Sequence, residues 1–231
     1  MTQRPFDLAD LKLLEQWDTA TICNGLELIA PDRRIIGFTM RQVVPLYPQK
    51  PPMVGLARVG TIRSREAPRG KVADRADWYE YVAKADLPTI VVMQDTDAQP
   101  GFGAFWGEVN TTVHRALGAL GCVTNGSFRD LAMCDPDFQV IGGSVGPSHA
   151  YVHVVDFGGP VDVLGMHVYH DDVVHADVHG AVVIPAECVR ALPAALDRVA
   201  QREKVILDFV KGPDFSPAGL RSIFARAGEI H

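Results

Sequence analysis

Two short segments hold acidic and basic side chains at spacings that could act together on one small molecule. Glu108 follows Gly107 at the start of an expected helix, and the adjacent pair Arg129-Asp130 follows a glycine turn at Gly126. A guanidinium can bind a carboxylate through two parallel hydrogen bonds, and carboxylates can hold a divalent cation or transfer a proton. Singly, each charge has an ordinary explanation as a helix-end charge or a surface ion pair. Together they predict a site for an anionic substrate.

The apolar pattern around these segments predicts the elements that carry them. Apolar side chains recur at helical spacing over residues 109–120, which places Glu108 in the first turn, where unpaired backbone N–H groups favour negative charge. Residues 122–124 are typical of a short buried strand, and a sharp glycine turn follows them. We therefore expect Arg129-Asp130 at the carboxyl end of that strand, the place where α/β sheets bind ligands.

The rest of the chain alternates helices with strands, which indicates an α/β protein. Helices are expected over residues 7–17, 18–28, 74–85 and 186–210, between Asp130 and Pro136, and from Pro217 onward. Strands are expected over residues 37–46, 54–62, 87–93, 138–141, 151–157, 161–163, 166–168 and 181–184. Pro193 either kinks the long helix or marks a late start. No repeat or linker interrupts the pattern, so residues 1–231 are expected to form one domain.

Composition and charge exclude several classes of protein. Hydrophobic residues make up 47% and charged residues 22% of the chain, values typical of a soluble globular protein. The net charge is −6, so we expect no nucleic-acid partner. No apolar run of about eighteen residues and no signal peptide is recognisable, so we expect no membrane partner. The four cysteines are far apart and are expected to be reduced thiols in a cytoplasmic protein.

Three loops each have a functional and a plain interpretation. Residues 99–107 combine three glycines with three aromatic side chains, and form either a mobile wall over a ligand or core and subunit contacts. Residues 142–149 are glycine-rich, and either supply backbone N–H donors to an oxyanion or only connect two strands. A basic run is expected to form a solvated loop at the mouth of a site. It consists of Arg63, Arg65, Arg69 and Lys71.

Histidine offers a rival hypothesis, because six of the eight histidines lie between His149 and His179. His175, Asp177 and His179 would share one face of a strand, which could suit zinc or non-haem iron. The segment has no His-x-His or His-Glu-x-x-His spacing, which argues against that site. His149 lies beside the glycine-rich loop and is expected to contact a substrate or to carry a proton.

Two blocks of the sequence resemble the RraA-like family. In the first, Gly107-Glu108 is followed after twenty residues by Arg129-Asp130, with a strand and a glycine turn between them. The second block covers residues 160–185. The family includes the regulator of ribonuclease E activity A, the 4-hydroxy-4-methyl-2-oxoglutarate aldolases and metal-dependent oxaloacetate decarboxylases.

The resemblance runs from about Asp18 to Lys211 and implies both a fold and an activity. The fold implied is an α/β swivelling β/β/α sandwich with flanking N- and C-terminal helices, assembled as homotrimers or homohexamers with sites between subunits. The activity implied is that of a divalent-metal-dependent lyase, an enzyme that cleaves a C–C bond in a 2-oxo acid and releases pyruvate or a similar 2-oxo acid. The alternative is a non-catalytic regulator that binds another protein, as the ribonuclease regulator does.

The resemblance also implies roles for the charged residues. Asp130 would hold Mg²⁺ or Mn²⁺, with several waters kept on the ion. Glu108 would bind one of these waters or move a proton through it, although many of the aldolases have the shorter Asp at this position. Arg129 would bind the substrate carboxylate and balance the charge of an enolate. Further substrate contacts are expected from Gly107, Val109, Asn110 and Thr111 at the helix N-terminus and from His149.

Overall fold

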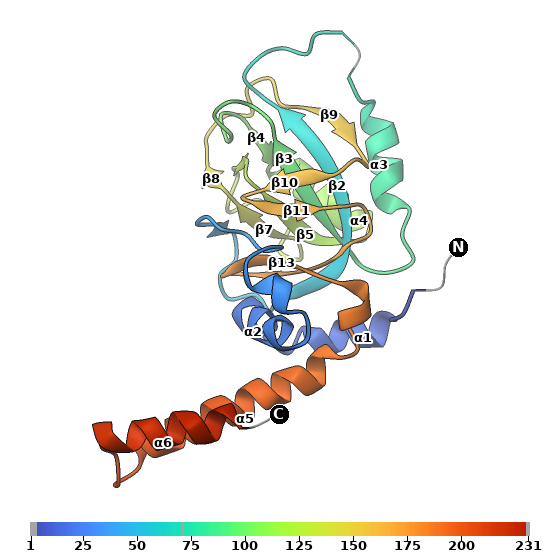
Figure 1. Ribbon diagram of the computed structural model, residues 1–231. Helices are drawn as coiled ribbons and strands as arrows, with labels where there is room; N and C mark the ends of the chain where they lie inside the picture. The colour runs from blue at the N-terminus through green and yellow to red at the C-terminus, as the bar shows by residue number, and fades with distance from the viewer. Residues whose placement is uncertain (1–3, 71, 230–231) are drawn as a thin grey trace.

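A curled sheet of eight strands forms the centre of the computed structural model, which describes residues 4–70 and 72–229 (Figure 1). The strands follow the order β1-β7-β5-β3-β2-β12-β13, and β9 also pairs with β2. Their bounds are β1 Val44–Pro45, β2 Met53–Arg63, β3 Thr89–Asp95, β5 Ala119–Thr124, β7 Gln139–Gly142, β9 His153–Phe157, β12 Val173–Asp177 and β13 Gly180–Ile184. The four strands β2, β3, β5 and β7 run parallel, and the outer strands pair antiparallel with their neighbours.

Strand β2 is the longest strand and has three neighbours. It pairs in parallel with β3 over residues 56–62, and antiparallel with β12 along its first half and β9 along its second. Residues 53–60 of β2 and 89–93 of β3 are all buried. Strands covered on both faces have nearly continuous apolar sequences. The predicted strands at 54–62 and 87–93 are therefore confirmed, although β3 begins and ends two residues later than predicted.

The hairpin of β10 (Val161–Val163) and β11 (Met166–Val168) packs against one face of the large sheet. Its four apolar side chains join alternate residues of β2 and β3 in a buried cluster that includes Val59 and Val92. Both strands were predicted with these bounds, because turn residues separate the two short apolar runs. The prediction of these two strands is confirmed.

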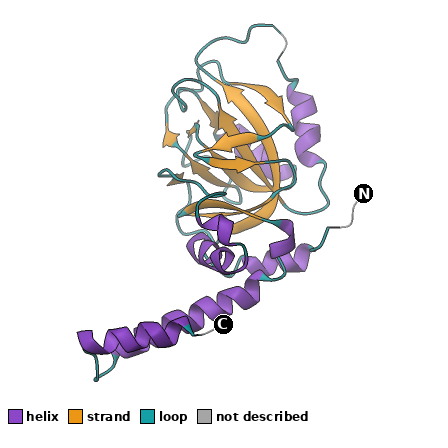
Figure 2. Ribbon diagram, viewed as in Figure 1, coloured by secondary structure: helices purple, strands orange, loops and turns teal. Residues whose placement is uncertain are grey.

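Helices α3 (Arg75–Ala83) and α4 (Glu108–Ala116) cover the opposite face of the sheet. Trp78 of α3 is completely buried in a second cluster with Val91 and Met93 of β3. These two strand residues alternate with those of the first cluster, as expected when successive side chains point to opposite faces. Figure 2 shows the helices outside the layers of strands.

Helices α1 (Leu8–Leu14) and α2 (Thr19–Ile29) cover the end of the sheet formed by β2, β12 and β13. The side-chain oxygens of Asp7 and Asp18 cap them by accepting hydrogen bonds from first-turn N–H groups. A short 3-10 helix over Pro31–Arg34 follows α2. The two predicted N-terminal helices are confirmed, although α1 ends three residues before the predicted end at residue 17.

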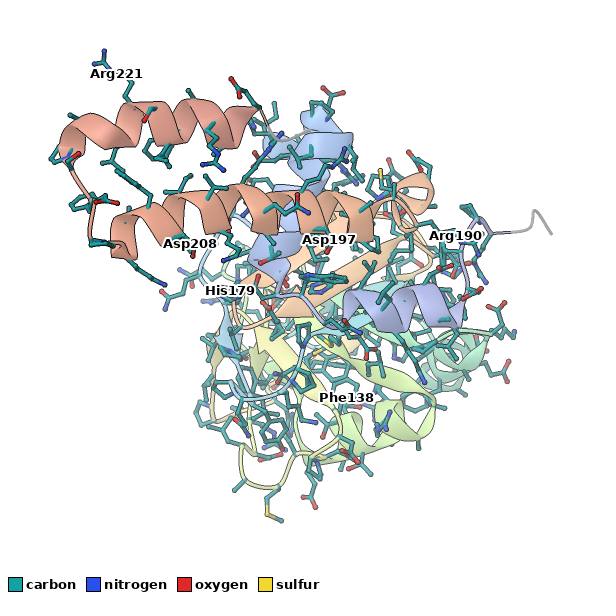
Figure 3. The ribbon with its side chains drawn as sticks, turned by 90° about the horizontal axis from the view of Figure 1, so that it is seen from below. Phe138, His179, Arg190, Asp197, Asp208 and Arg221 are labelled. Carbon is teal, nitrogen blue, oxygen red and sulfur yellow. The ribbon has the colours of Figure 1, made fainter. Side chains whose placement is uncertain are left out.

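The C-terminal part of the chain forms a helical hairpin that projects from the body. Helix α5 (Leu192–Lys211) packs its first turns against α2, where Gly25 allows Leu196 to approach: a Cβ on this glycine would lie 2.6 Å from Cδ2 of Leu196. Beyond these turns, α5 and α6 (Pro217–Gly228) lie side by side away from the sheet (Figures 1 and 3). Large apolar side chains stay exposed on the hairpin, namely Leu207, Val210, Phe215 and Phe224.

Other predicted boundaries also need correction, most of all those of α4, α5 and β5. The long helix begins at Leu192, after a separate 3-10 helix over Ala186–Cys188, so Pro193 marks a late start and not a kink. Helix α4 ends at Ala116, because Gly118 adopts a left-handed conformation (φ +94°), and the strand that follows begins earlier than predicted.

Two other predicted elements differ in kind. The segment between Asp130 and Pro136 forms turns and not a helix, with the N–H groups of Met133 and Cys134 both donating to the carbonyl of Asp130. The strand predicted over 37–46 forms only in part. It consists of β1 and of a single bridge at residue 38, and the residues between them are not paired as a strand. None of the helices among the described residues has the length and apolar character needed to cross a membrane.

Candidate active site

A small sheet of three parallel strands positions the candidate site (Figure 1). Its strands are β4 (Ala104–Trp106), β6 (Ser127–Phe128) and β8 (Ser144–Val145), which pair in the order β4-β6-β8. Because carboxyl ends of neighbouring parallel strands meet at one edge, the residues that follow β4 and β6 lie side by side. Those residues are Gly107-Glu108 and Arg129-Asp130.

The placement of Arg129 and Asp130 differs from the prediction in one respect. They do not follow the strand predicted over 122–124, since β6 lies between that strand and the charged pair. The pairing of β6 with β4 continues one step further, where the N–H of Arg129 donates to the carbonyl of Trp106 at 2.9 Å. This bond fixes the charged pair beside the start of α4.

A cleft of about 540 Å³ opens over this edge. Most of the predicted site residues line it: Gly107, Glu108, Val109, Asn110, Arg129, Asp130 and His149. Sequence reasoning missed several others, namely Arg75, Ala150, Tyr151, Val152 and His153. They reach the cleft from the start of α3 and from the segment 150–153 that ends in the first residue of β9, and no local motif marks them.

The N-terminus of α4 faces the cleft with free donors. Its N-cap is Gly107, which has no side chain to cap the helix, and the N–H of Glu108 makes only a long contact of 3.4 Å to Oδ2 of Asp130. Thr111 does not line the cleft, and its N–H already donates to the carbonyl of Gly107 at 2.9 Å. The N–H groups of Val109 and Asn110 are therefore the ones available to an anion.

The side chains of Arg129 and Asp130 form a loose pair, with 3.4 Å between Nε and Oδ2. Both are about one-third exposed. Among the described residues, no group donates to Oδ1 of Asp130, and the carboxylate of Glu108 has no partner. Asp130 has a left-handed backbone (φ +55°), a conformation that is uncommon outside glycine and is found preferentially at functional sites. The turn that holds it leaves Oδ1 of Asp130 and the carboxylate of Glu108 available to a ligand, while Oδ2 of Asp130 makes the long contacts to Arg129 and to the N–H of Glu108.

Gly107 provides the space for the carboxylate of Asp130. A Cβ built on Gly107 would lie 2.6 Å from Oδ2 of Asp130 and 3.3 Å from Cγ of Arg129. The backbone of Gly107 is extended (φ −171°), so any residue could adopt its conformation. The glycine is needed because a side chain would occupy the place of the Asp130 carboxylate.

A buried histidine joins the two helices behind the cleft. Nδ1–H of His114 donates to the carbonyl of Asn110 (2.7 Å), and Nε2 accepts from Nε1–H of Trp78 on α3 (2.9 Å). Burial lowers the pKa of His114 to about 4, so the imidazole is neutral. Nδ2 of Asn110 in turn donates to the carbonyl of Phe105, 2.5 Å away. These bonds fix the first turn of α4 against both α3 and β4.

The loop after β8 brings His149 to the cleft. It returns to β4, where the N–H of Ala104 donates to the carbonyl of Ser148 at 2.9 Å. Nδ1–H of His149 donates to the carbonyl of Ala150 at 2.7 Å, and Ala150 has a left-handed backbone (φ +46°). The glycine-rich segment 142–149 is thus more than a connection, because it carries β8 and one wall of the cleft.

Two further loops, the segment 99–107 and the basic run within residues 63–71, also reach the cleft in part. In the segment 99–107, Phe105 lines the cleft, whereas Trp106 is core and stacks on Phe138. In the basic run, Pro68 lines the cleft, so this loop lies at the mouth of the site as predicted. Lys71 lies outside the described residues.

The rival prediction of a metal site at His175, Asp177 and His179 is wrong. His175 is fully buried, its Nδ1 accepts from the hydroxyl of Thr19 (2.9 Å), and its Nε2–H donates to the carbonyl of Trp17 (3.0 Å). Asp177 accepts from the N–H of Thr19 and pairs with His179. These groups hold the connection between α1 and α2. Among the described residues, no three His, Cys, Asp or Glu side chains are grouped so that they could hold a metal.

Together these features define an α/β protein in which a small parallel sheet brings two carboxylates, a guanidinium and a free helix N-terminus into one cleft. The chain belongs to the RraA-like family, whose model, described as Aldolase/RraA, matches residues 19–183. The predicted family and the α/β fold class are confirmed.

Solved structures share this fold. RraAS2 from Streptomyces coelicolor, described as an unusual member of the RNase ES inhibitor RraA protein family, is 20% identical with a TM-score of 0.68, covering 85% of this chain and 96% of its own. An uncharacterized protein from Pseudomonas syringae pv. tomato is 17% identical with a TM-score of 0.69, covering 95% and 100%. A structure described among novel cellulases from gut-associated microbes is 17% identical with a TM-score of 0.71, covering 88% and 89%. At these identities the likeness shows the fold alone. No curated protein matches the chain.

Proposed function

We propose that the chain is a lyase that cleaves a C–C bond in a 2-oxo acid and releases pyruvate or a similar 2-oxo acid. The observation that carries this proposal is the grouping of Glu108, Arg129 and Asp130 around the free N-terminus of α4. A surface that only bound another protein would have no need of this grouping. A cleft of about 540 Å³ also has the size of a site for a small molecule.

The positive groups of the cleft suit the acid end of such a substrate. The guanidinium of Arg129 can bind a carboxylate through two hydrogen bonds, and the N–H groups of Val109 and Asn110 can donate to it as well. Cleavage next to a 2-oxo group leaves an electron pair on carbon, which the 2-oxo group accepts as an enolate. Fixed positive groups stabilise that charge most effectively when water is excluded. We assign this role to Arg129 and the helix N-terminus.

The two carboxylates suit a hard divalent cation, which we propose as a cofactor. Glu108 and Asp130 supply only oxygen donors, and Oδ1 of Asp130 accepts no hydrogen bond from the described residues. Mg²⁺ and Mn²⁺ prefer oxygen ligands, and Mg²⁺ commonly uses one or two carboxylates together with waters. Asp130 would hold the ion and Glu108 would hold one of its waters. When bound, the ion would supply positive charge against the 2-oxo group of the substrate.

We further propose a homo-oligomer, a trimer or hexamer, in the cytoplasm. The projecting hairpin of α5 and α6 exposes Leu207, Phe215 and Phe224, and an exposed apolar face supports contact with another chain. The four cysteines are free thiols, which supports a reducing compartment. The regulator hypothesis predicts binding to another protein and no turnover, so an activity assay separates it from the lyase hypothesis.

The proposal is tested by measuring pyruvate release from oxaloacetate and from 4-hydroxy-4-methyl-2-oxoglutarate. With Mg²⁺, we expect release from at least one acid at a rate at least about tenfold above the metal-promoted rate without protein. Excess chelator should return the rate to the background, and added Mg²⁺ should restore it. A folded protein that releases no pyruvate from either acid would contradict the proposed function and favour the regulator.

Substituting Gly107 by alanine tests whether the position of Asp130 matters to turnover. The new Cβ would displace the Asp130 carboxylate, so we expect kcat to fall at least about tenfold, since catalysis tolerates little misplacement. The matched control is Gly159→Ala, because a Cβ at that position meets nothing within 4 Å. Unfolding midpoints of both variants report the fold. Equal kcat values for the two variants would show that the spacing at Gly107 is not needed.

A further inference from the structure

His149 is held in the cleft by the same small sheet that positions the charged residues. The loop that carries it follows β8 and is bound to β4 through Ser148. The carbonyl of His149 also accepts from the N–H of Val152 at 3.0 Å and lies against Gly103, where a Cβ would be 2.5 Å from it. The backbone around His149 is therefore fixed relative to β4 and the start of α4.

The hydrogen bonding of the imidazole determines which nitrogen can accept a proton. The carbonyl of Ala150 can only accept, so Nδ1 of His149 must carry a hydrogen. In the neutral ring, Nε2 then has a free lone pair, and it has no partner among the described residues. The left-handed turn at Ala150 supports this arrangement, with its N–H bonded to Oγ of Ser148 at 3.0 Å. His149 is thus a proton acceptor at the wall of the cleft.

The other proton acceptors of the cleft differ from His149 in their surroundings. Glu108 and Asp130 lie close together at the edge of the small sheet, and their carboxylates suit the cation, whereas the neighbouring Arg129 suits the acid end of the substrate. His153 also lines the cleft, with Nδ1–H donated to the carbonyl of Tyr151 (2.7 Å). It belongs to β9 of the large sheet and not to the small sheet. Of the two histidines, only His149 is on a loop fixed to β4.

We propose that Nε2 of His149 is the base that takes the hydroxyl proton of a 4-hydroxy-2-oxo acid during C–C cleavage. The inference rests on the proposed lyase function and adds the base that this site would use. The O–H bond of the hydroxyl group on C4 breaks, and its proton moves to Nε2. The electron pair of that bond forms the C4=O double bond, and the C3–C4 pair passes to the 2-oxo group as the enolate of pyruvate. The imidazolium then gives its proton to C3, which restores the neutral ring and completes pyruvate.

This role predicts different effects on two reactions of one site. Aldol cleavage requires loss of a hydroxyl proton, whereas decarboxylation of oxaloacetate has no such proton to lose. Positioned general bases contribute roughly 10²–10⁴-fold to rates. The matched variants are His149→Gln and His153→Gln, because both side chains line the cleft and both use Nδ1 in a backbone hydrogen bond.

The test compares kcat for 4-hydroxy-4-methyl-2-oxoglutarate with kcat for oxaloacetate in the wild type and in each variant. For His149→Gln, the ratio of the first kcat to the second should fall at least about 30-fold, whereas His153→Gln should keep the wild-type ratio. An unchanged ratio in His149→Gln, or a lowered ratio in His153→Gln alone, would overturn the assignment. Wild-type protein that decarboxylates oxaloacetate but does not cleave the hydroxy acid would overturn it too. Wild-type protein inactive on both acids would instead contradict the proposed function.

Discussion

Replacing Asp130 by asparagine is expected to lower kcat for pyruvate release at least about 100-fold while the fold is retained. The change removes the negative charge that we assign to cation binding and keeps the shape of the side chain. Asparagine adopts the left-handed conformation of this position (φ +55°) more readily than most residues, so the turn should be preserved. The loss of activity would therefore report the charge and not the backbone.

The measurement compares kcat and KM with saturating Mg²⁺, together with the midpoint of thermal unfolding. Asp137→Asn is the matched control, because it makes the same chemical change in an exposed carboxylate outside the cleft. It should keep wild-type kinetics. Equal activity of the two variants would remove Asp130 from the site.

Substitutions of Glu108 and Arg129 are expected to lower activity as well. Glu108→Gln should lower kcat because a neutral amide would hold the water of the cation less strongly than a carboxylate does. Arg129→Ala should both raise KM and lower kcat because it removes the binding group for the carboxylate. Arg129→Lys should recover only part of the loss, since an ammonium lacks the planar fork of a guanidinium. If Glu108→Gln, Arg129→Ala and Asp130→Asn all kept full activity, the assigned site would be wrong.

The charged residues that line the cleft could be picked out from the sequence because their signals are local. Glu108 follows a glycine at a helix start, and Arg129-Asp130 follows a glycine turn, so both patterns lie within a few residues of sequence. The long buried strands were predictable for the same reason, as the apolar run ending at Met93 shows. Local patterns of this kind determine element type well but give no information on which elements meet.

The small sheet was not predictable, because its strands have two or three residues and show no periodicity. Its parallel pairing brings Glu108 beside Asp130 across 22 positions of sequence. Arg75 and His153 reach the cleft from still more distant elements. Likewise, the apolar period of α5 predicts a helix. It does not show that the second half of this helix projects away from the sheet and packs against α6.

The histidines show most clearly that local sequence patterns do not reveal which residues meet in the fold. Their clustering in the sequence suggested a metal site, yet His175 binds backbone carbonyls near the end of α1. The histidine that matters most for the fold near the cleft, His114, lies outside that cluster and meets Trp78, a residue 36 positions away. Its role follows from burial and from partners that no local pattern contains.

Acid is expected to destabilise the protein through His114. The unfolded chain takes up a proton at a pKa of 6.5, whereas burial holds the pKa in the folded protein at about 4. The stabilising effect is thus complete above the unfolded pKa and is lost as the pH falls from 6.5 towards 4. Between about pH 7.5 and about pH 5, this difference corresponds to a loss of about 2 kcal/mol in the free energy of unfolding. Burial also lowers the pKa of His175, which acts in the same direction.

Protonation of His114 would also break the contact between α3 and α4. A charged ring carries a hydrogen on Nε2, which would then face Nε1–H of Trp78 at the present 2.9 Å, so two donors would oppose each other. Because α4 carries Glu108 in its first turn, acid should loosen the site before the whole chain unfolds. Urea unfolding at the two pH values measures the global effect, and hydrogen exchange of the α4 amides measures the local one.

His114→Gln separates this histidine from the other titrating groups. The variant should be less stable at neutral pH, because glutamine cannot make both hydrogen bonds of the buried ring, but it should lose about 2 kcal/mol less on acidification than the wild type. The control is His167→Gln, since His167 is exposed, and this variant should keep the wild-type pH dependence. If His114→Gln keeps the full pH dependence, then the acid sensitivity arises elsewhere and the neutral ring is not what joins α3 to the first turn of α4.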